Sequence, residues 1–279
     1  MVGMAAALSL AVALIMAIPD RPAPEAWSRT GSAGAATSIL SFNVIEGGRP
    51  AAAALDAIEA AATDIVCLQE MTPQLTAAFV QRLGSRYPHR VFEPRQRTQG
   101  VGIASRYPLS GGRVLTLGLR YLPAVAADAD LPAGPVHIAC VHLMPPHAGF
   151  NKGGDLIKRY QRNTAIRIAQ TRALLDHLDR VAGPAIVLGD MNEWPGQAAM
   201  TLFRDAGFGD ACHGTGSRCG PTWPGRILPL PALFRIDHIL GRGVAFSGAA
   251  VLEAGGSDHY PVAARVIVGP RQLAEGNAR

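Results

Sequence analysis

Side chains that can perform acid–base and metal chemistry recur at the C-terminal ends of apolar, β-branched segments. They are Asn43 in SFNV, Glu70 in DIVCLQE, His142 in HIACVHL, Asp190 and Asn192 in IVLGDMN, Asp237 in RIDHIL, and Asp258 and His259 in GSDHYPV. A strand end is where a rigid sheet meets the loops, so a side chain there is well positioned and within reach of a substrate. A lone Asn or Asp-His pair is usually a turn former. Six such strand ends in one chain indicate an active site.

The residue types favour hydrolysis of a phosphate ester. Carboxylates without thiols suit a hard divalent cation, Mg²⁺ or Mn²⁺. A histidine beside an aspartate is a hydrogen-bond donor whose charge the carboxylate stabilises, and an asparagine donates to phosphate oxygens without adding charge. A cation, imidazolium donors and a water oriented by an aspartate are what in-line displacement at phosphorus requires.

Two other classes of metal-dependent hydrolase are excluded by their motifs. A calcineurin-like metallophosphoesterase would need an early DxH, a GNHD or GNHE and a late GHxH, and a metallo-β-lactamase-type enzyme would need HxHxDH. None of these occurs in the sequence. A catalytically inactive, membrane-tethered binding module is the alternative from another class. Loss of activity would be expected to remove Glu70, Asp190 or His259 first, and all three are present.

The segments that must position these residues alternate between strand and helix patterns. Strands are predicted at residues 38–44, 64–70, 87–92, 100–105, 136–143, 185–190, 236–240, 244–252 and 262–268. Helices are predicted at 51–62, 73–83, 163–181 and 197–206. Nine or more strands are too many for a comfortable single open sheet. We therefore expect one α/β (α+β) domain over residues 38–268 that contains two sheets.

In this order, SFNV, CLQE, GVGIASRYPL, VHL, LGDMN, RIDHI and GSDHYPV resemble the motifs of the endonuclease/exonuclease/phosphatase superfamily, over residues 38–266. That superfamily includes deoxyribonuclease I, exonuclease III-type abasic-site endonucleases, neutral sphingomyelinases and inositol polyphosphate 5-phosphatases. The resemblance implies a deoxyribonuclease I-like fold, a four-layer sandwich of two packed mixed β-sheets flanked by helices. It also implies a Mg²⁺-dependent hydrolase of phosphate esters, with Mn²⁺ as a substitute.

The resemblance assigns the metal-binding positions, whereas the candidates for substrate binding are chosen by residue type. Glu70 would ligate the Mg²⁺, with Asn43 beside it and Asp258 near the metal. Arg106 in GVGIASRYPL and Trp223 in TWP are the candidates for substrate binding. Trp223 would stack on a base, a sugar or a lipid headgroup, and a packed position in the core is the alternative.

The same resemblance assigns catalytic roles. His142 would hydrogen-bond the scissile phosphate, and Asn192 would contact the same phosphate or the nucleophile. Asp190 would orient or deprotonate the attacking water. His259, paired with Asp237, would stabilise the developing charge or act as the base in its place. The general base therefore stays open between Asp190 and His259.

The distribution of charge favours an anionic substrate. The formal net charge is +5. Eight arginines stand against the single acid Glu93 between residues 81 and 120, and six basic residues stand against Asp155 between 147 and 172. Nucleic acid fits these stretches and would bind in a salt-dependent way. A phospholipid headgroup or an inositol phosphate fits equally well, and the sequence leaves the two open.

The uncharged N-terminal segment predicts a location outside the cytoplasm. Residues 1–19 are uncharged and indicate an N-terminal hydrophobic signal or membrane anchor, a buried first helix being the alternative. Residues 20–37 are predicted as a flexible linker and 269–279 as a C-terminal tail. We expect a monomer that is membrane-anchored or secreted, and periplasmic if the source is bacterial.

The four cysteines show two patterns. Cys67 and Cys140 lie inside apolar strand segments, which predicts buried free thiols. Cys212 and Cys219 lie in the loop-like stretch CHGTGSRC, which predicts a short disulfide in an oxidising compartment.

Overall fold

The computed structural model describes residues 36–44, 51–120, 122–213, 217, 219–225, 231–253 and 255–269. The predicted N-terminal anchor, most of the predicted linker and most of the predicted tail lie outside these residues. Within the described ranges, no helix combines the length and the apolar character that crossing a membrane requires.

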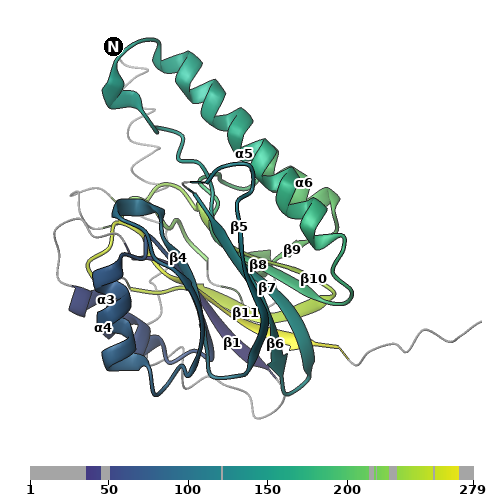
Figure 1. Cartoon of the computed structure of the whole chain (residues 1–279). Helices are drawn as coiled ribbons and strands as arrows, with labels where there is room; N and C mark the ends of the chain where they lie inside the picture. The colour runs from purple at the N-terminus through teal and green to yellow at the C-terminus, as the bar shows by residue number, and fades with distance from the viewer. Residues whose placement is uncertain are drawn as a thin grey trace, which may run out of the picture.

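Two six-stranded sheets form the centre of the molecule (Figure 1). The first has the order β11-β12-β1-β2-β4-β3, with β1 (Thr37–Asn43), β2 (Ile65–Gln69), β3 (His89–Glu93), β4 (Val101–Ser105), β11 (Val244–Val251) and β12 (Val262–Val268). The second has the order β5-β6-β7-β8-β10-β9, with β5 (Leu109–Leu115), β6 (Ala124–Leu131), β7 (Gly134–His142), β8 (Ala185–Asp190), β9 (Gly209–Asp210) and β10 (Asp237–Arg242). Both sheets are mixed, because β1/β2 and β7/β8 are parallel and the other pairs are antiparallel.

Four helices cover the outer faces of the sheets and complete the predicted four-layer sandwich. Helices α3 (Ala51–Ala61) and α4 (Pro73–Leu83) pack on the first sheet, and α5 (Leu156–Leu178) and α6 (Ala198–Asp205) pack on the second. Short 3-10 turns lie at Arg97–Gln99, Phe150–Lys152 and Ala211–His213. The deoxyribonuclease I-like fold expected from the sequence is confirmed.

Alternation along the strands divides the core into three parts: one between the two sheets, one between the first sheet and its helices, and one between the second sheet and its helices. Successive strand residues point to opposite faces of a sheet, so Ile65 and Cys67 of β2 point to the space between the sheets, whereas Val66 and Leu68 pack against α3 and α4. On the second sheet, inward residues such as Ile138 alternate with residues that pack on α5 and α6. Both faces of the central strands of each sheet are therefore buried.

The cysteine pairing differs in part from the expectation. Cys67 and Cys140 are not free thiols but form a disulfide across the space between the sheets, with their Cα atoms 5.6 Å apart. Both residues point inward from facing strands, which brings their sulfur atoms together although 73 residues separate them in sequence. The predicted disulfide between Cys212 and Cys219 is present.

The structure also contains strands that the sequence patterns did not predict. They are β5, which is largely exposed and contains Gly111 and Gly112, β6, whose sequence AVAADADL is rich in alanine, and the two-residue β9. Helix α5 begins seven residues earlier than the predicted position 163. Asp155 caps it, because the Asp155 Oδ1 atom accepts a hydrogen bond from the Lys158 N–H across 3.0 Å.

Candidate active site

The polar strand-end residues extend the inward rows of the core. Asn43, His142, Asp190 and Asp237 occupy inward positions of β1, β7, β8 and β10, in phase with the apolar residues that fill the space between the sheets. The parallel pairs end at the same edge, and β10 is antiparallel to β8, so its first residue, Asp237, lies opposite Asp190. Four strands thus deliver their side chains to one place.

The glycine of LGDMN is required by close packing between β7 and β8. A Cβ atom at position 189 would lie 2.0 Å from the Val141 carbonyl oxygen, and Gly189 has a φ of 149°. Only glycine adopts such a backbone conformation without strain. Gly189 therefore allows β8 to approach β7 closely just before Asp190.

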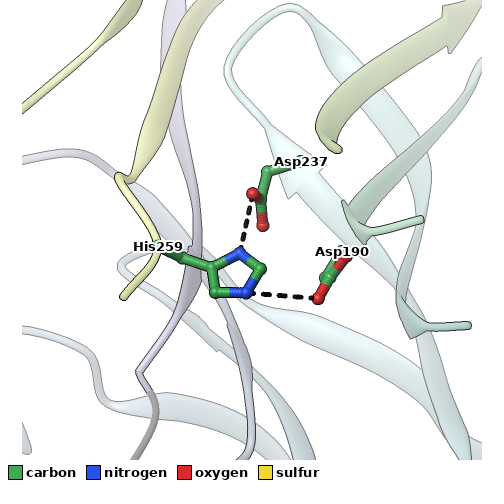
Figure 2. Close-up of side chains that lie close together, drawn as sticks. All are labelled: Asp190, Asp237 and His259. Atoms are coloured by element: carbon green, nitrogen blue, oxygen red, sulfur yellow. Dashed lines mark hydrogen bonds and ion pairs between the residues drawn. The ribbon is translucent and has the colours of Figure 1, made fainter. Parts of the chain in front are cut away.

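His259 lies between two buried carboxylates (Figure 2). Its Nδ1 atom is 2.9 Å from Asp237 Oδ2, and its Nε2 atom is 3.7 Å from Asp190 Oδ2. Burial alone would lower the pKa of His259, but the charges of Asp237 and Asp190 outweigh it and raise the pKa. The imidazole is therefore held protonated, with one N–H directed to Asp237 and the other toward Asp190.

Asp190 is fixed by hydrogen bonds to both of its oxygens. The Asn43 Nδ2 group donates to Oδ2 across 3.1 Å, and the Asn192 backbone N–H donates to Oδ1 across 2.8 Å. Burial raises the pKa of Asp190, against the opposing charge of His259. The result is an oriented carboxylate with a strengthened affinity for a proton.

Glu70 follows β2 and is connected to Asp190 through Asn43. The Asn43 Nδ2 group also donates to Glu70 Oε1 across 3.1 Å. Burial raises the pKa of Glu70 to about 8, despite the hydrogen bond from Asn43. The charge of His259 only partly offsets this burial, and a bound cation would stabilise the ionised carboxylate further.

Unpartnered oxygens around Glu70 fit a divalent cation. Asn43 Oδ1, Glu70 Oε2 and Asp258 Oδ1 are buried and have no hydrogen-bond partner among the described residues. Carboxylate and amide oxygens are the ligands that Mg²⁺ and Mn²⁺ take. The oxygens of Asn43, Glu70 and Asp258 therefore fit the Mg²⁺ or Mn²⁺ ion that the sequence implied.

A second set of ligand atoms lies nearby. Atoms of Asp190, Asp237 and His259 lie within 4.8 Å of one another, close enough for one ion. In this set, however, the His259 Nδ1 atom and Asp237 Oδ2 already satisfy each other across 2.9 Å. Asp237 Oδ1, by contrast, is buried without a hydrogen-bond partner among the described residues, so this set is a second candidate metal site beside the oxygens around Glu70.

His142 and Asn192 lie on the other side of Asp190. The His142 Nε2 atom is 3.6 Å from Asp190 Oδ2. Burial, reinforced by the charge of His259, lowers the pKa of His142 to about 4, so its imidazole is neutral near pH 7 and offers one N–H donor. The Asn192 side chain donates to the Leu143 carbonyl across 3.0 Å, and this bond ties the loop after β8 to the loop after β7.

These residues line a cleft of about 310 Å³ with an aromatic wall. The Trp194 and Phe234 rings stack with centroids 5.4 Å apart, and Phe234 and Trp223 stack at 6.3 Å. The Trp223 indole N–H also donates to Asp258 Oδ2 across 3.2 Å. The wall therefore begins at the candidate metal site and continues to the opening of the cleft, where Trp194 and Phe234 are exposed.

The structure does not bring Arg106 into the cleft. Arg106 follows β4 and donates to Asp64 Oδ1 across 2.9 Å. Asp64 precedes β2, whereas Glu70 follows it, so Arg106 lies at the opposite end of the first sheet. The other predicted site residues line the cleft or contact residues that do.

Sequence reasoning gave no site role to a buried ion pair behind the cleft. The Arg167 Nε atom donates to Glu193 Oε1 across 2.9 Å, and the Arg167 Nη1 atom donates to the Met144 carbonyl across 3.0 Å. One turn along α5, Gln170 Oε1 accepts a hydrogen bond from the Met144 N–H. The available signal was the pair of polar residues, Arg167 and Gln170, at helical spacing in line with Leu174 and Leu178 on the buried face of α5.

Comparisons with known proteins identify the family and the fold. The sequence profile described as "Endonuclease/Exonuclease/phosphatase family" matches residues 40–259. An endonuclease/exonuclease/phosphatase from Bacteroides vulgatus superposes with a TM-score of 0.68 at 16% identity, over 85% of this chain and 100% of that one. Danio rerio TDP2 complexed with a single-strand DNA product superposes with a TM-score of 0.64 at 18% identity, over 84% of this chain and 99% of that one. No curated protein matched the sequence.

Proposed function

The chain belongs to the endonuclease/exonuclease/phosphatase family, and we propose that it is a divalent-metal-dependent hydrolase that cleaves phosphodiester bonds. The observation that carries the proposal is the position of Asp190. Its Oδ2 atom lies within 4 Å of both His142 Nε2 and His259 Nε2 and accepts a hydrogen bond from Asn43. A carboxylate surrounded by donors at the base of a cleft suits hydrolysis of an anionic ester.

Glu70, Asn43 and Asp258 would hold the cation, because their buried oxygens lack other partners among the described residues. Mg²⁺ is the proposed ion, with Mn²⁺ as a substitute. When bound, such an ion polarises a phosphoryl oxygen and neutralises charge that develops on it.

Asp190 would orient the attacking water and take a proton from it. The hydrogen bonds from Asn43 and from the Asn192 N–H fix the direction of the carboxylate. Burial raises its pKa, which favours acceptance of the proton as the water oxygen bonds to phosphorus. The bond between phosphorus and the leaving oxygen breaks on the opposite side. The alternative, in which His259 is the base, would require a neutral imidazole, and the charges of Asp237 and Asp190 disfavour that state.

His259 and His142 would stabilise the charge on the phosphoryl oxygens. His259 is held protonated by Asp237 and directs its Nε2–H into the cleft toward Asp190. His142 contributes a neutral N–H donor from the facing strand. Fixed donors around a developing oxyanion lower the barrier without reorganisation.

Nucleic acid is the first candidate substrate, and a phospholipid or inositol phosphate is the alternative. The structural neighbour from Danio rerio was crystallised with a single-strand DNA product. The stacked rings of Trp194, Phe234 and Trp223 suit a flat group next to the phosphate, and bases stack on such side chains without sequence preference. A lipid headgroup would use the same phosphate-binding groups.

The two disulfides indicate an oxidising, extracytoplasmic environment. We propose that the protein is a monomer, either secreted or anchored through residues 1–19, and periplasmic if bacterial. Residues 20–37 would be the linker, 38–268 the catalytic domain and 269–279 the tail.

Hydrolysis of bis-p-nitrophenyl phosphate tests the proposal directly. We expect activity with Mg²⁺ or Mn²⁺ that EDTA abolishes and that Glu70→Gln reduces by about a thousandfold or more. Glu59→Gln, which alters an exposed carboxylate, is the matched control and should keep the full rate. Activity that persists in EDTA would contradict the metal requirement.

A folded protein that is inactive with every cation would favour the inactive binding module. If the generic diester is cleaved, parallel assays would distinguish the candidate substrates. They would use supercoiled plasmid, single-stranded DNA, sphingomyelin, cardiolipin and inositol phosphates.

A further inference from the structure

The buried stripe of α5 continues beyond the body of the sandwich. Arg167, Leu174 and Leu178 recur at helical spacing and are buried against the second sheet. The same stripe includes Tyr160 and Leu156 in the first two turns, where the side chains are 38% and 49% exposed. Figure 1 shows that this part of α5 projects past the ends of the strands. Two apolar side chains in line with the buried face of α5 are therefore left in solvent.

Ile157 enlarges this exposed apolar area. It lies next to Leu156 in the first turn of α5 and is 71% exposed, the highest value among the large apolar residues of the described chain. Exposed apolar side chains that gather at one place on a monomer usually mark an interaction site.

More exposed apolar residues lie at the same end of the sandwich. Trp194 follows the end of β8, and Leu233 and Phe234 precede β10, whose first residue pairs with the last residue of β8. Helix α5 starts at this end too, because it follows β7, which is parallel to β8. The opening of the cleft and the tip of α5 therefore share one end of the molecule.

Basic residues surround the tip of α5. Lys152, Lys158 and Arg162 are exposed, and Arg159 is half-buried. Asp155 is the only acid between residues 147 and 172, and it is engaged as the cap of α5. The tip thus combines exposed apolar side chains with an excess of positive charge.

We propose that the tip of α5, defined as Leu156, Ile157 and Tyr160 with Lys152, Lys158 and Arg162, docks on an anionic lipid bilayer. Apolar side chains beside Lys and Arg suit the bilayer interface, where the former enter the acyl boundary and the latter meet anionic headgroups. Nucleic acid would engage the cations but leave the three apolar side chains in water. An apolar protein groove would not require the cations.

Docking in this way would present the cleft to the bilayer, because the opening of the cleft lies at the same end. If the proposed function holds, docking of this kind favours the alternative substrate over nucleic acid, namely a phosphodiester at a membrane surface such as a phospholipid headgroup. The docking itself requires no catalysis, so the two proposals fail separately.

Fluorescence of a Tyr160→Trp variant of the full chain tests the docking. Vesicles of phosphatidylcholine and phosphatidylglycerol in equal parts, with brominated acyl chains, quench tryptophans that enter the bilayer. We expect the emission that Tyr160→Trp adds to the wild-type signal to be quenched and to shift to the blue. Val80→Trp, at an exposed apolar position on α4, is the matched control and should add emission that is not quenched. The N-terminal segment is the same in both variants.

Charge reversal tests the electrostatic part. Lys158→Glu with Arg162→Glu, in the Tyr160→Trp background, should weaken vesicle binding about tenfold or more and remove its salt dependence. Ile157→Ser should weaken binding while the rate on bis-p-nitrophenyl phosphate stays unchanged. The protein should bind only weakly to vesicles of pure phosphatidylcholine, which carry no net charge.

Three results would overturn the proposal. The first is added emission from Tyr160→Trp that vesicles leave unchanged, or quench no more than that from Val80→Trp. The second is a response to a single-stranded oligonucleotide and not to vesicles, which would assign the surface to nucleic acid. The third is a response that follows protein concentration in the absence of lipid, which would assign it to a second copy of the chain.

Discussion

Arg167 and Glu193 form a buried ion pair that connects α5 with the loop after β8, with 2.9 Å between Arg167 Nε and Glu193 Oε1. The same guanidinium binds the Met144 carbonyl, two residues after His142. Glu193 directly follows Asn192, and its second oxygen accepts the Ala199 N–H across 2.8 Å. Arg167 therefore contacts both the loop that follows β7 and the loop that follows β8.

Arg167→Met should destabilise the protein by about 3–5 kcal/mol, because it leaves Glu193 buried and unpaired. Since both site loops would loosen, kcat should fall more than KM rises for the enzyme that remains folded. Urea denaturation and steady-state kinetics measure the two effects, and Arg172→Met, at an exposed position on the same helix, is the control. An unchanged kcat per folded molecule would limit Arg167 to a role in stability.

Asp237→Asn should reduce kcat by about 10²–10⁴-fold in a protein that still folds. Asparagine keeps the size of the side chain but removes the charge that holds His259 protonated. Kinetics with bis-p-nitrophenyl phosphate and circular dichroism check the two parts, with Asp130→Asn at an exposed position as the control. Retention of the full rate would remove the Asp237–His259 pair from the mechanism.

The two disulfides should differ in what they contribute to stability. Replacement of Cys67 and Cys140 by alanine should cost about 4 kcal/mol and replacement of Cys212 and Cys219 about 2 kcal/mol, because loop-closure entropy grows with the length enclosed. The sequence separations are 73 and 7 residues. Denaturation of the two double variants gives the comparison directly, and equal losses would contradict the entropic explanation.

The contribution of Asp210 to stability should depend on pH. Burial alone would raise the pKa of Asp210, but the hydrogen bond from His238 and the charges of His238 and Arg235 outweigh it and hold the pKa well below its usual range. Because the folded-state pKa lies below the unfolded value of about 3.9, the stabilisation is present above about pH 4 and is lost as the pH falls further.

Asp210→Asn should therefore cost ~1.5–3 kcal/mol at pH 7 and progressively less below pH 4. Urea denaturation of both proteins across this range tests the sign. A difference that grows on acidification would contradict the assignment.

The sequence predicted most of the fold because its strands and helices carry strong periodic patterns. Strand β8 and helix α4 begin and end where the patterns predicted. The strands β5 and β6 were not predicted because glycine pairs and alanine runs have little β propensity. In the structure, β6 is stabilised by pairing with β7, and β5 by pairing with β6. Helix α5 was predicted too short because polar residues outnumber apolar ones in its first two turns, LIKRYQR.

Residues of the candidate site were predictable where they end a strand, because a polar side chain directly after an apolar strand pattern is visible in the sequence. Contacts between side chains of the two sheets were not predictable, because the pattern of one strand does not indicate which strand of the other sheet faces it. Cys67 and Cys140 are the clearest example: each looks like an ordinary core residue until the sheets are packed. Glu193 was missed for the same reason, as its partner lies on a helix.

The alternation that places Asn43, His142, Asp190 and Asp237 on the inward faces also determines which changes of chain length the protein tolerates. Loss or gain of one residue within β1, β7, β8 or β10 would turn each side chain beyond it to the opposite face. Catalytic groups would then point toward the covering helices. Loops beyond the strand ends, such as residues 145–155, are free of this constraint. Insertions and deletions in those loops are therefore the accessible route to a new substrate, with the catalytic residues left in place.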